Sequence, residues 1–122
     1  MKQTKYTEQT FIDQSMEYFD RNYGGQDLHN IAPSPFLVDI LKNKHIRMNN
    51  YSVLDIGCTP AANMNYLRNK YNCKCVRIEP NVKLVNKLKK IFPEFEFYCG
   101  TSDRLPFQDN SFDFVLLRSV LH

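Results

Sequence analysis

The sequence predicts an α/β fold in which two N-terminal helices precede a parallel β-sheet. Before residue 50, apolar side chains recur only at helical spacing, whereas after it short apolar runs alternate with amphipathic helical segments. This alternation is typical of parallel strands joined by right-handed crossover helices. With 122 residues, 43% of them hydrophobic and 24% charged, the chain has the length and composition of one ordinary globular domain.

Two helices are predicted within residues 1–50. The first has its apolar face over residues 11–19 and ends at Gly24-Gly25, because glycine tolerates the left-handed conformation that is common after a helix. The second begins at Pro33-Ser34-Pro35, since proline suits the first turn of a helix, and its apolar stripe covers residues 36–41.

Four strands and two further helices are predicted after residue 50. The strands are residues 51–56, 73–78, 95–99 and 112–117, and the helices are residues 61–70 and a segment that Asn81 caps and that ends near residue 92. The carboxyl ends of parallel strands share one edge of the sheet, and ligands bind beyond that edge where the strand order reverses. We therefore expect a binding site near residues 55–61, Glu79-Pro80 and residues 100–103.

The first two of these segments have the features of a nucleotide site. Gly57 ends the first strand in a tight turn before a helix N-terminus, whose free N–H groups suit a carboxylate or a phosphate. Glu79 lies 22 positions after Gly57, close to the ~20 at which such folds place an acid on ribose hydroxyls. The alternative, that Glu79 only caps the following helix, is less favoured because Asp55 and Gly57 accompany it.

The common dinucleotide and phosphate loops do not match this sequence. The fingerprint G-x-G-x-x-G would require glycine at Thr59, and the loop G-x-x-x-x-G-K-[ST] does not occur. Instead Asp55 comes two residues before Gly57, where a carboxylate would repel a pyrophosphate. This acid favours a ligand that carries positive charge near the glycine turn.

Residues 51–122 resemble the class I S-adenosylmethionine-dependent methyltransferases, in particular the small-molecule branch, in four blocks that occur in the family's order. The blocks are Val53-Leu54-Asp55-Ile56-Gly57-Cys58, Val76-Arg77-Ile78-Glu79-Pro80-Asn81, Gly100-Thr101-Ser102-Asp103-Arg104-Leu105-Pro106-Phe107 and Asp109-Asn110-Ser111-Phe112-Asp113-Phe114-Val115. The resemblance implies a Rossmann-like sheet. The family's strand order is 3-2-1-4-5-7-6, of which this chain would supply 3-2-1-4.

The resemblance also implies which residues bind the cofactor, S-adenosylmethionine. In the family, the glycine loop of the first block lies beside the methionine part of the cofactor. The acid of the second block binds both ribose hydroxyls, and the third block covers the adenine. The stretch after the fourth strand leads towards the methyl-transfer site. The candidate cofactor-binding residues are, in that order, Asp55, Gly57, Thr59, Ala61, Glu79, Thr101, Ser102 and Arg118. No residue is a credible general base, so no catalytic residue is predicted.

Four positions depart from the family's pattern. Thr59 replaces a glycine and puts a Cβ where backbone and cofactor approach closely. Ala61 replaces the next glycine and is expected only to limit the packing of helix against strand. Arg77 occupies a position where the family often has a small residue, and Thr101 one where an acid commonly reaches the adenine amino group.

By this resemblance the chain is a methyltransferase, or the N-terminal part of one, that transfers a methyl group from S-adenosylmethionine to a small molecule. Residues 1–50 would form a helical cap, and residues 51–122 a cofactor-binding region that stops after the fourth strand. The alternative is a non-catalytic, truncated remnant that acts as a weak cofactor-binding or interaction module. Three more strands encoded directly downstream would favour the enzyme. Because the N-terminal helix covers the active site in this family, Tyr6, Tyr18 and Tyr23 either line an acceptor pocket or simply pack.

Composition and charge argue against other classes of partner. A net charge of +3 is too weak to indicate nucleic acid, and no apolar run approaches the roughly 18 residues of a membrane span. The four cysteines have no secretory context, so we expect reduced thiols buried as small hydrophobes and a cytoplasmic location. Cys73 and Cys75 lack the spacing of zinc ligands, and no metal is expected. The fourth strand would lie at the sheet edge, where we expect self-association or a partner chain.

Overall fold

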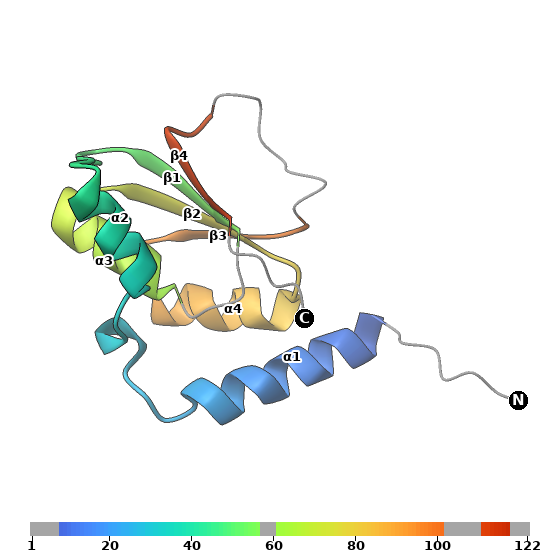
Figure 1. Cartoon of the computed structure of the whole chain (residues 1–122). Helices are drawn as coiled ribbons and strands as arrows, with labels where there is room; N and C mark the ends of the chain where they lie inside the picture. The colour runs from blue at the N-terminus through green and yellow to red at the C-terminus, as the bar shows by residue number, and fades with distance from the viewer. Residues whose placement is uncertain (1–7, 57–60, 102–110, 118–122) are drawn as a thin grey trace, which may run out of the picture.

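A four-stranded parallel sheet with helices on one side forms the chain (Figure 1). The computed structural model describes residues 8–56, 61–101 and 111–117. The helices are α1 (Glu8–Tyr23), the short 3-10 helix η1 (Leu28–Asn30), α2 (Pro35–Asn43), α3 (Ala62–Tyr71) and α4 (Val82–Ile91). The strands are β1 (Ser52–Ile56), β2 (Lys74–Glu79), β3 (Glu96–Cys99) and β4 (Phe114–Leu117). Within these ranges, no helix combines the length and the apolar character that crossing a membrane requires.

Helix α1 ends and helix α2 begins where the sequence predicts. The N–H of Gly24 donates to the carbonyl of Asp20 at 2.9 Å, and a Cβ at Gly24 would collide with that carbonyl. Gly25 follows with a φ of 77°, a left-handed conformation that glycine adopts without strain. Pro35 is the first residue of α2, where its missing N–H has no helical acceptor to lose.

The side chain of Asn81 joins the beginning of α4 to α1. Its Oδ1 accepts hydrogen bonds from the N–H groups of Lys83 at 3.0 Å and Leu84 at 3.2 Å, so the predicted cap is confirmed. Its Nδ2 donates to the carbonyl of Ile12 in α1 at 3.2 Å. Asn81 is buried, and one amide therefore serves two helices at once.

Helix α1 lies alongside α4 and runs in the same direction (Figure 1). An ion pair joins Lys83 to Asp13 at 3.7 Å, and another joins Lys87 to Asp20 at 2.9 Å. The later residue of α4 thus contacts the later residue of α1, as expected for two helices that run in the same direction. The first fifty residues and the sheet also share one hydrophobic core. Its members include Phe19, Leu28, Leu37, Leu41, Met48, Val53, Met64, Leu67, Cys75, Leu84, Val85, Leu88, Phe92 and Phe97.

The strand order is β3-β2-β1-β4 with every neighbouring pair parallel, which confirms the predicted order 3-2-1-4. Asp55 of β1 pairs with Arg77 of β2, and Glu79 pairs with Cys99 of β3. Paired residues of parallel strands point to the same face, and successive residues alternate between faces. Asp55, Arg77 and Glu79 therefore lie on the same face as Cys75, which belongs to the core beneath the helices.

All four strands begin one or two residues later than predicted, and contacts before β3 and β4 explain the later starts of these two. Phe95 belongs to the turn after α4, where its N–H donates to the carbonyl of Phe92 at 3.1 Å, so β3 starts at Glu96. Before β4, the side chain of Asp113 accepts a hydrogen bond from the N–H of Ser52 at 2.8 Å. The regular pairing of β4 with β1 starts only after this contact.

On the other face of the sheet the edge strands carry exposed apolar side chains, whereas Leu54 and Ile78 of the central strands are buried. In Figure 1 the labelled α-helices lie below and to the left of the sheet. On the opposite face, Tyr98, Val115 and Leu117 are 41%, 51% and 69% exposed. Among the described residues, β4 pairs only with β1, so it lies at the predicted edge of the sheet.

Candidate functional site

The carboxyl edge of the sheet brings together Asp55, Glu79 and Thr101. Asp55 precedes the last residue of β1, Glu79 ends β2, and Thr101 is exposed two residues after the end of β3. The N–H of Gly100 donates to the carbonyl of Glu79 at 3.1 Å, which holds the segment after β3 against the end of β2. Four of the predicted residues lie outside the described ranges: Gly57, Thr59, Ser102 and Arg118.

Three charged side chains are buried together at this edge. Asp55, Arg77 and Glu79 are only 4%, 0% and 3% exposed. Burial raises the pKa of Glu79 to about 7, because loss of water disfavours the carboxylate. The charge of Asp55 raises this pKa further, whereas the charge of Arg77 lowers it. The site therefore holds a carboxyl group that is close to its midpoint of ionisation at neutral pH.

Glu79 does not cap α4, and one of its carboxyl oxygens has no donor in the described part of the chain. Asn81 caps α4, so the alternative role considered for Glu79 is taken by another residue. Oε2 of Glu79 is buried, and no donor in the described part of the chain bonds to it. A buried acceptor without a donor is costly, and a ligand with hydroxyl groups would satisfy it.

Ala61 corrects an expectation from the sequence, which treated this alanine as a mild change. It precedes α3 with a φ of 57°, in the left-handed region, and it is buried. A Cβ in this conformation approaches the following carbonyl oxygen and costs about 1–2 kcal/mol. A glycine here would avoid backbone strain as well as crowding between helix and strand.

Cys99 also differs from its prediction. The sequence suggested a buried small hydrophobe, but the thiol is exposed and its Sγ donates to the carbonyl of Pro80 at 3.6 Å. The reason is that β3 is an edge strand of the described sheet, so among the described strands its last residue has a neighbour on one side only. Cys99 pairs with Glu79 and is therefore an unpredicted member of the candidate site.

The two cysteines before and within β2 are buried, as expected for small hydrophobes. Cys73 donates to the carbonyl of Met48 at 3.2 Å, and Cys75 to that of Met64 at 3.7 Å. Burial raises the pKa of Cys75 to about 12, so its thiol is neutral. Within the described ranges, no three His, Cys, Asp or Glu side chains are grouped so that they could hold a metal ion.

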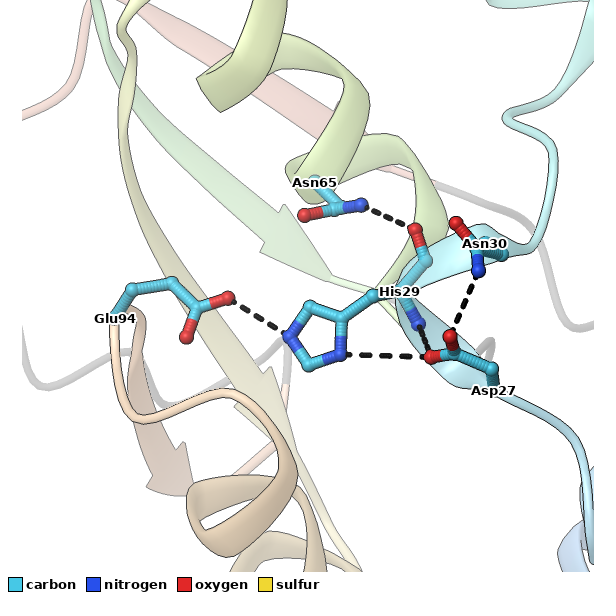
Figure 2. A network of polar contacts seen from close by, with 5 residues as sticks. All are labelled: Asp27, His29, Asn30, Asn65 and Glu94. Atoms are coloured by element: carbon cyan, nitrogen blue, oxygen red, sulfur yellow. Dashed lines mark hydrogen bonds and ion pairs between the residues drawn. The ribbon is translucent and has the colours of Figure 1, made fainter.

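A second polar cluster surrounds His29 and contains none of the candidate cofactor-binding residues (Figure 2). Nε2 of His29 lies 3.2 Å from Oε1 of Glu94, and Nδ1 lies 3.9 Å from Oδ1 of Asp27. Nδ2 of Asn65 donates to the carbonyl of His29 at 2.9 Å, and Nδ2 of Asn30 donates to Oδ2 of Asp27 at 2.7 Å. These bonds tie η1 to α3 and to the turn before β3. The sequence does not reveal this cluster, because Glu94 is 65 positions from His29.

Two cavities have linings that include none of the three buried charged residues. The larger, about 460 Å³, lies between α3 and residues 29–33. The smaller, about 230 Å³, is lined by Phe19, Tyr23 and Ile91, near the end of α4 that is remote from Glu79. Tyr23 packs against Phe19, with ring centroids 5.5 Å apart, and Tyr18 is exposed. Tyr23 therefore both packs against Phe19 and lines the smaller cavity, and Tyr6 lies outside the described residues.

Residues 54–122 match a family model described as "Methyltransferase domain", which is more than half of the chain. No curated protein matches this sequence. Solved structures share its fold. One is a protein of Galdieria sulphuraria proposed to be a sarcosine dimethylglycine methyltransferase, with a TM-score of 0.64 and 15% identity over 84% of this chain and 47% of that one.

Two further structures have the same fold. A TehB-like SAM-dependent methyltransferase from Corynebacterium glutamicum has a TM-score of 0.57 and 23% identity over 84% of this chain and 53% of that one. A SAM-dependent methyltransferase from Aquifex aeolicus has a TM-score of 0.55 and 18% identity over 91% of this chain and 56% of that one. The chain thus spans about half the length of the solved structures that it resembles.

Proposed function

Because this chain belongs to the methyltransferase domain family, we propose that it is the cofactor-binding half of an S-adenosylmethionine-dependent methyltransferase with a small-molecule acceptor. In this proposal residues 51–122 bind the cofactor, and residues 1–50 form a helical cap. The free thiols of Cys73, Cys75 and Cys99 are in keeping with a cytoplasmic location, which is part of the proposal.

The observation that carries the proposal is the buried acceptor of Glu79 at the carboxyl edge of the sheet. An ionised carboxylate has two oxygens and donates nothing, so it can accept hydrogen bonds from two neighbouring ribose hydroxyls. Oε2 of Glu79 has no donor among the described residues, and Asp55 adds negative charge on the same face. Two acids beside each other suit a cofactor that is rich in hydroxyl groups and positively charged.

The described residues would bind and orient, and they would not transfer protons. S-adenosylmethionine supplies a methyl group activated by a sulfonium centre. Glu79 would accept from the ribose, and Asp55 would favour positive charge near the turn after β1. The rate of an in-line displacement depends mainly on how the acceptor is oriented towards the methyl group. A site of this kind can therefore work without a general base.

A second candidate function is a non-catalytic module that binds the cofactor weakly or associates with another chain. The observation that favours it is the edge strand β4, whose Val115 and Leu117 are exposed on a face that no described helix covers. The partner would be a second copy of the chain or another chain that pairs with β4.

Calorimetry with S-adenosylhomocysteine tests the cofactor site. Glu79→Ala is expected to weaken binding by ~1–3 kcal/mol, because the ribose hydroxyls lose a charged acceptor. Glu96→Ala is the matched control, since Glu96 is exposed and lies on the opposite face of the sheet. Equal affinities of the wild type and Glu79→Ala would remove Glu79 from the site.

A further inference from the structure

A fully buried arginine lies in the sheet beside the candidate site. Arg77 belongs to β2, pairs with Asp55 of β1 and comes two residues before Glu79. The three side chains therefore point to the same face of the sheet. A guanidinium remains charged when it is buried, so its burial is tolerable only where negative charge compensates it.

The other groups on this face add little charge. Cys75 is a neutral thiol, because burial raises its pKa to about 12. On β3, the neighbours in register are the apolar Phe97, opposite Arg77, and the thiol of Cys99, opposite Glu79. The described charged side chains of the helices lie at the surface, including Asp13, Asp20, Arg68, Lys83 and Lys87. Among the residues that the structure describes, two carboxyl groups and one guanidinium thus determine the electrostatics of the buried cluster.

Without the guanidinium, the pKa of Glu79 would lie further above neutral, and the two acids would be ionised together in a smaller fraction of the molecules at pH 7. Burial and the charge of Asp55 both raise the pKa of Glu79, and Arg77 opposes them. Two carboxyl groups that are buried close together without a counter-charge tend to share a proton, because two like charges repel in a medium of low polarity. A protonated Glu79 would have one oxygen that donates, and it could no longer accept on both oxygens.

We propose that Arg77 is a positioning residue for cofactor binding: its buried guanidinium allows Asp55 and Glu79 to be ionised side by side, so that both oxygens of Glu79 can accept hydrogen bonds. The inference rests on the proposed function, since it assigns the ribose hydroxyls to Glu79. The family often has a small residue at this position, so the charge is a property of this chain.

The first test follows the Glu79 carboxyl by 13C NMR in the protein without ligand. Arg77→Met keeps much of the side-chain volume and removes the charge, and it should move the titration midpoint of Glu79 upward by about one unit or more. Arg77→Lys keeps the charge and should leave the midpoint within about half a unit of the wild type. An unchanged midpoint in folded Arg77→Met would overturn the proposal. So would a displacement of about one unit in Arg77→Lys, even if Arg77→Met does not fold.

The second test measures the affinity for S-adenosylhomocysteine between pH 6 and pH 9. In Arg77→Met, binding should be about tenfold weaker than in the wild type at pH 7 and should largely recover at pH 9, since one pKa unit corresponds to a tenfold change. Equal weakening at every pH would indicate a packing role and overturn the proposal. A wild type that does not bind at any pH would contradict the proposed function, whereas the NMR titration still decides the role of Arg77.

Discussion

Asp113 and Ser52 are joined by two hydrogen bonds at the start of neighbouring parallel strands. The N–H of Ser52 donates to Oδ2 of Asp113 at 2.8 Å, and the N–H of Asp113 donates to the carbonyl of Ser52 at 2.9 Å. The two residues are 61 positions apart, so the contact closes a long segment of chain. It fixes where β4 begins along β1.

Asp113→Ala is expected to lower the free energy of unfolding by about 1 kcal/mol, because the N–H of Ser52 loses a charged acceptor at an exposed site. Asp113→Asn retains a side-chain oxygen at the same place and should cost less. Urea unfolding of the three proteins checks this. If both variants are as stable as the wild type, the contact does not hold β4 in place.

Ala61→Gly is expected to stabilise the chain by about 0.5–1 kcal/mol, since relief of the left-handed strain outweighs the added backbone entropy of glycine. Ala62→Gly is the matched control. Ala62 is the first residue of α3, where glycine should destabilise the helix by about 0.5–1 kcal/mol. Thermal unfolding measures both changes, and the same sign for the two variants would contradict the strain at Ala61.

The stability of the chain is expected to fall as the pH rises from 4.5 towards 7. Burial raises the pKa of Glu79 from 4.5 to about 7, so in this window the folded chain holds a proton that the unfolded chain has released. The folded state then binds more protons, and its free energy of unfolding declines with increasing pH. Glu79→Gln cannot ionise and should be more stable than the wild type at pH 8 by about 2–3 kcal/mol.

Urea unfolding at pH 5 and pH 8 provides the measurement for this prediction. Glu96→Gln serves as the control, because Glu96 is exposed on the other face and should keep the pH dependence of the wild type. A wild type and a Glu79→Gln variant with parallel pH profiles would show that Glu79 titrates as an ordinary glutamate.

The isolated chain is expected to self-associate through β4. Its edge has no described strand beside it, and Leu117 is an exposed apolar residue there. Leu117→Lys should reduce the association, because a charge on an edge strand opposes pairing with another chain. Phe36→Lys, which changes an exposed apolar residue of α2, should leave the association unchanged. Light scattering over a concentration series compares the three, and a monomeric wild type would count against association through this edge.

The alternation of apolar periods was sufficient to predict the helices, the strands and a parallel sheet, since these elements follow their local patterns. The strand order 3-2-1-4 was implied by the resemblance to the methyltransferases. The Asn81 cap and the turn at Gly24 were likewise predictable, because they depend on residues three or four positions apart. Only part of the cluster of Asp55, Arg77 and Glu79 could be predicted from the sequence. The acids could be placed at the carboxyl edge, but the burial of Arg77 depends on the register between β1 and β2.

Other features depend on contacts that no local pattern encodes. The left-handed backbone of Ala61 follows from the path between β1 and α3, and alanine gives no sign of it in the sequence. The exposure of Cys99 follows from the edge position of β3. The link between His29 and Glu94 requires that η1 and the turn before β3 already be adjacent.

The double role of Asn81 has a consequence for local opening of the chain. Because its Oδ1 caps α4 and its Nδ2 holds Ile12, α1 cannot detach without leaving a buried amide group unsatisfied beside the end of β2. The middle of α1 and the first turn of α4 should therefore exchange their amide hydrogens as one cooperative unit. A ligand held at Glu79, two residues before Asn81, would slow the exchange of both helices together.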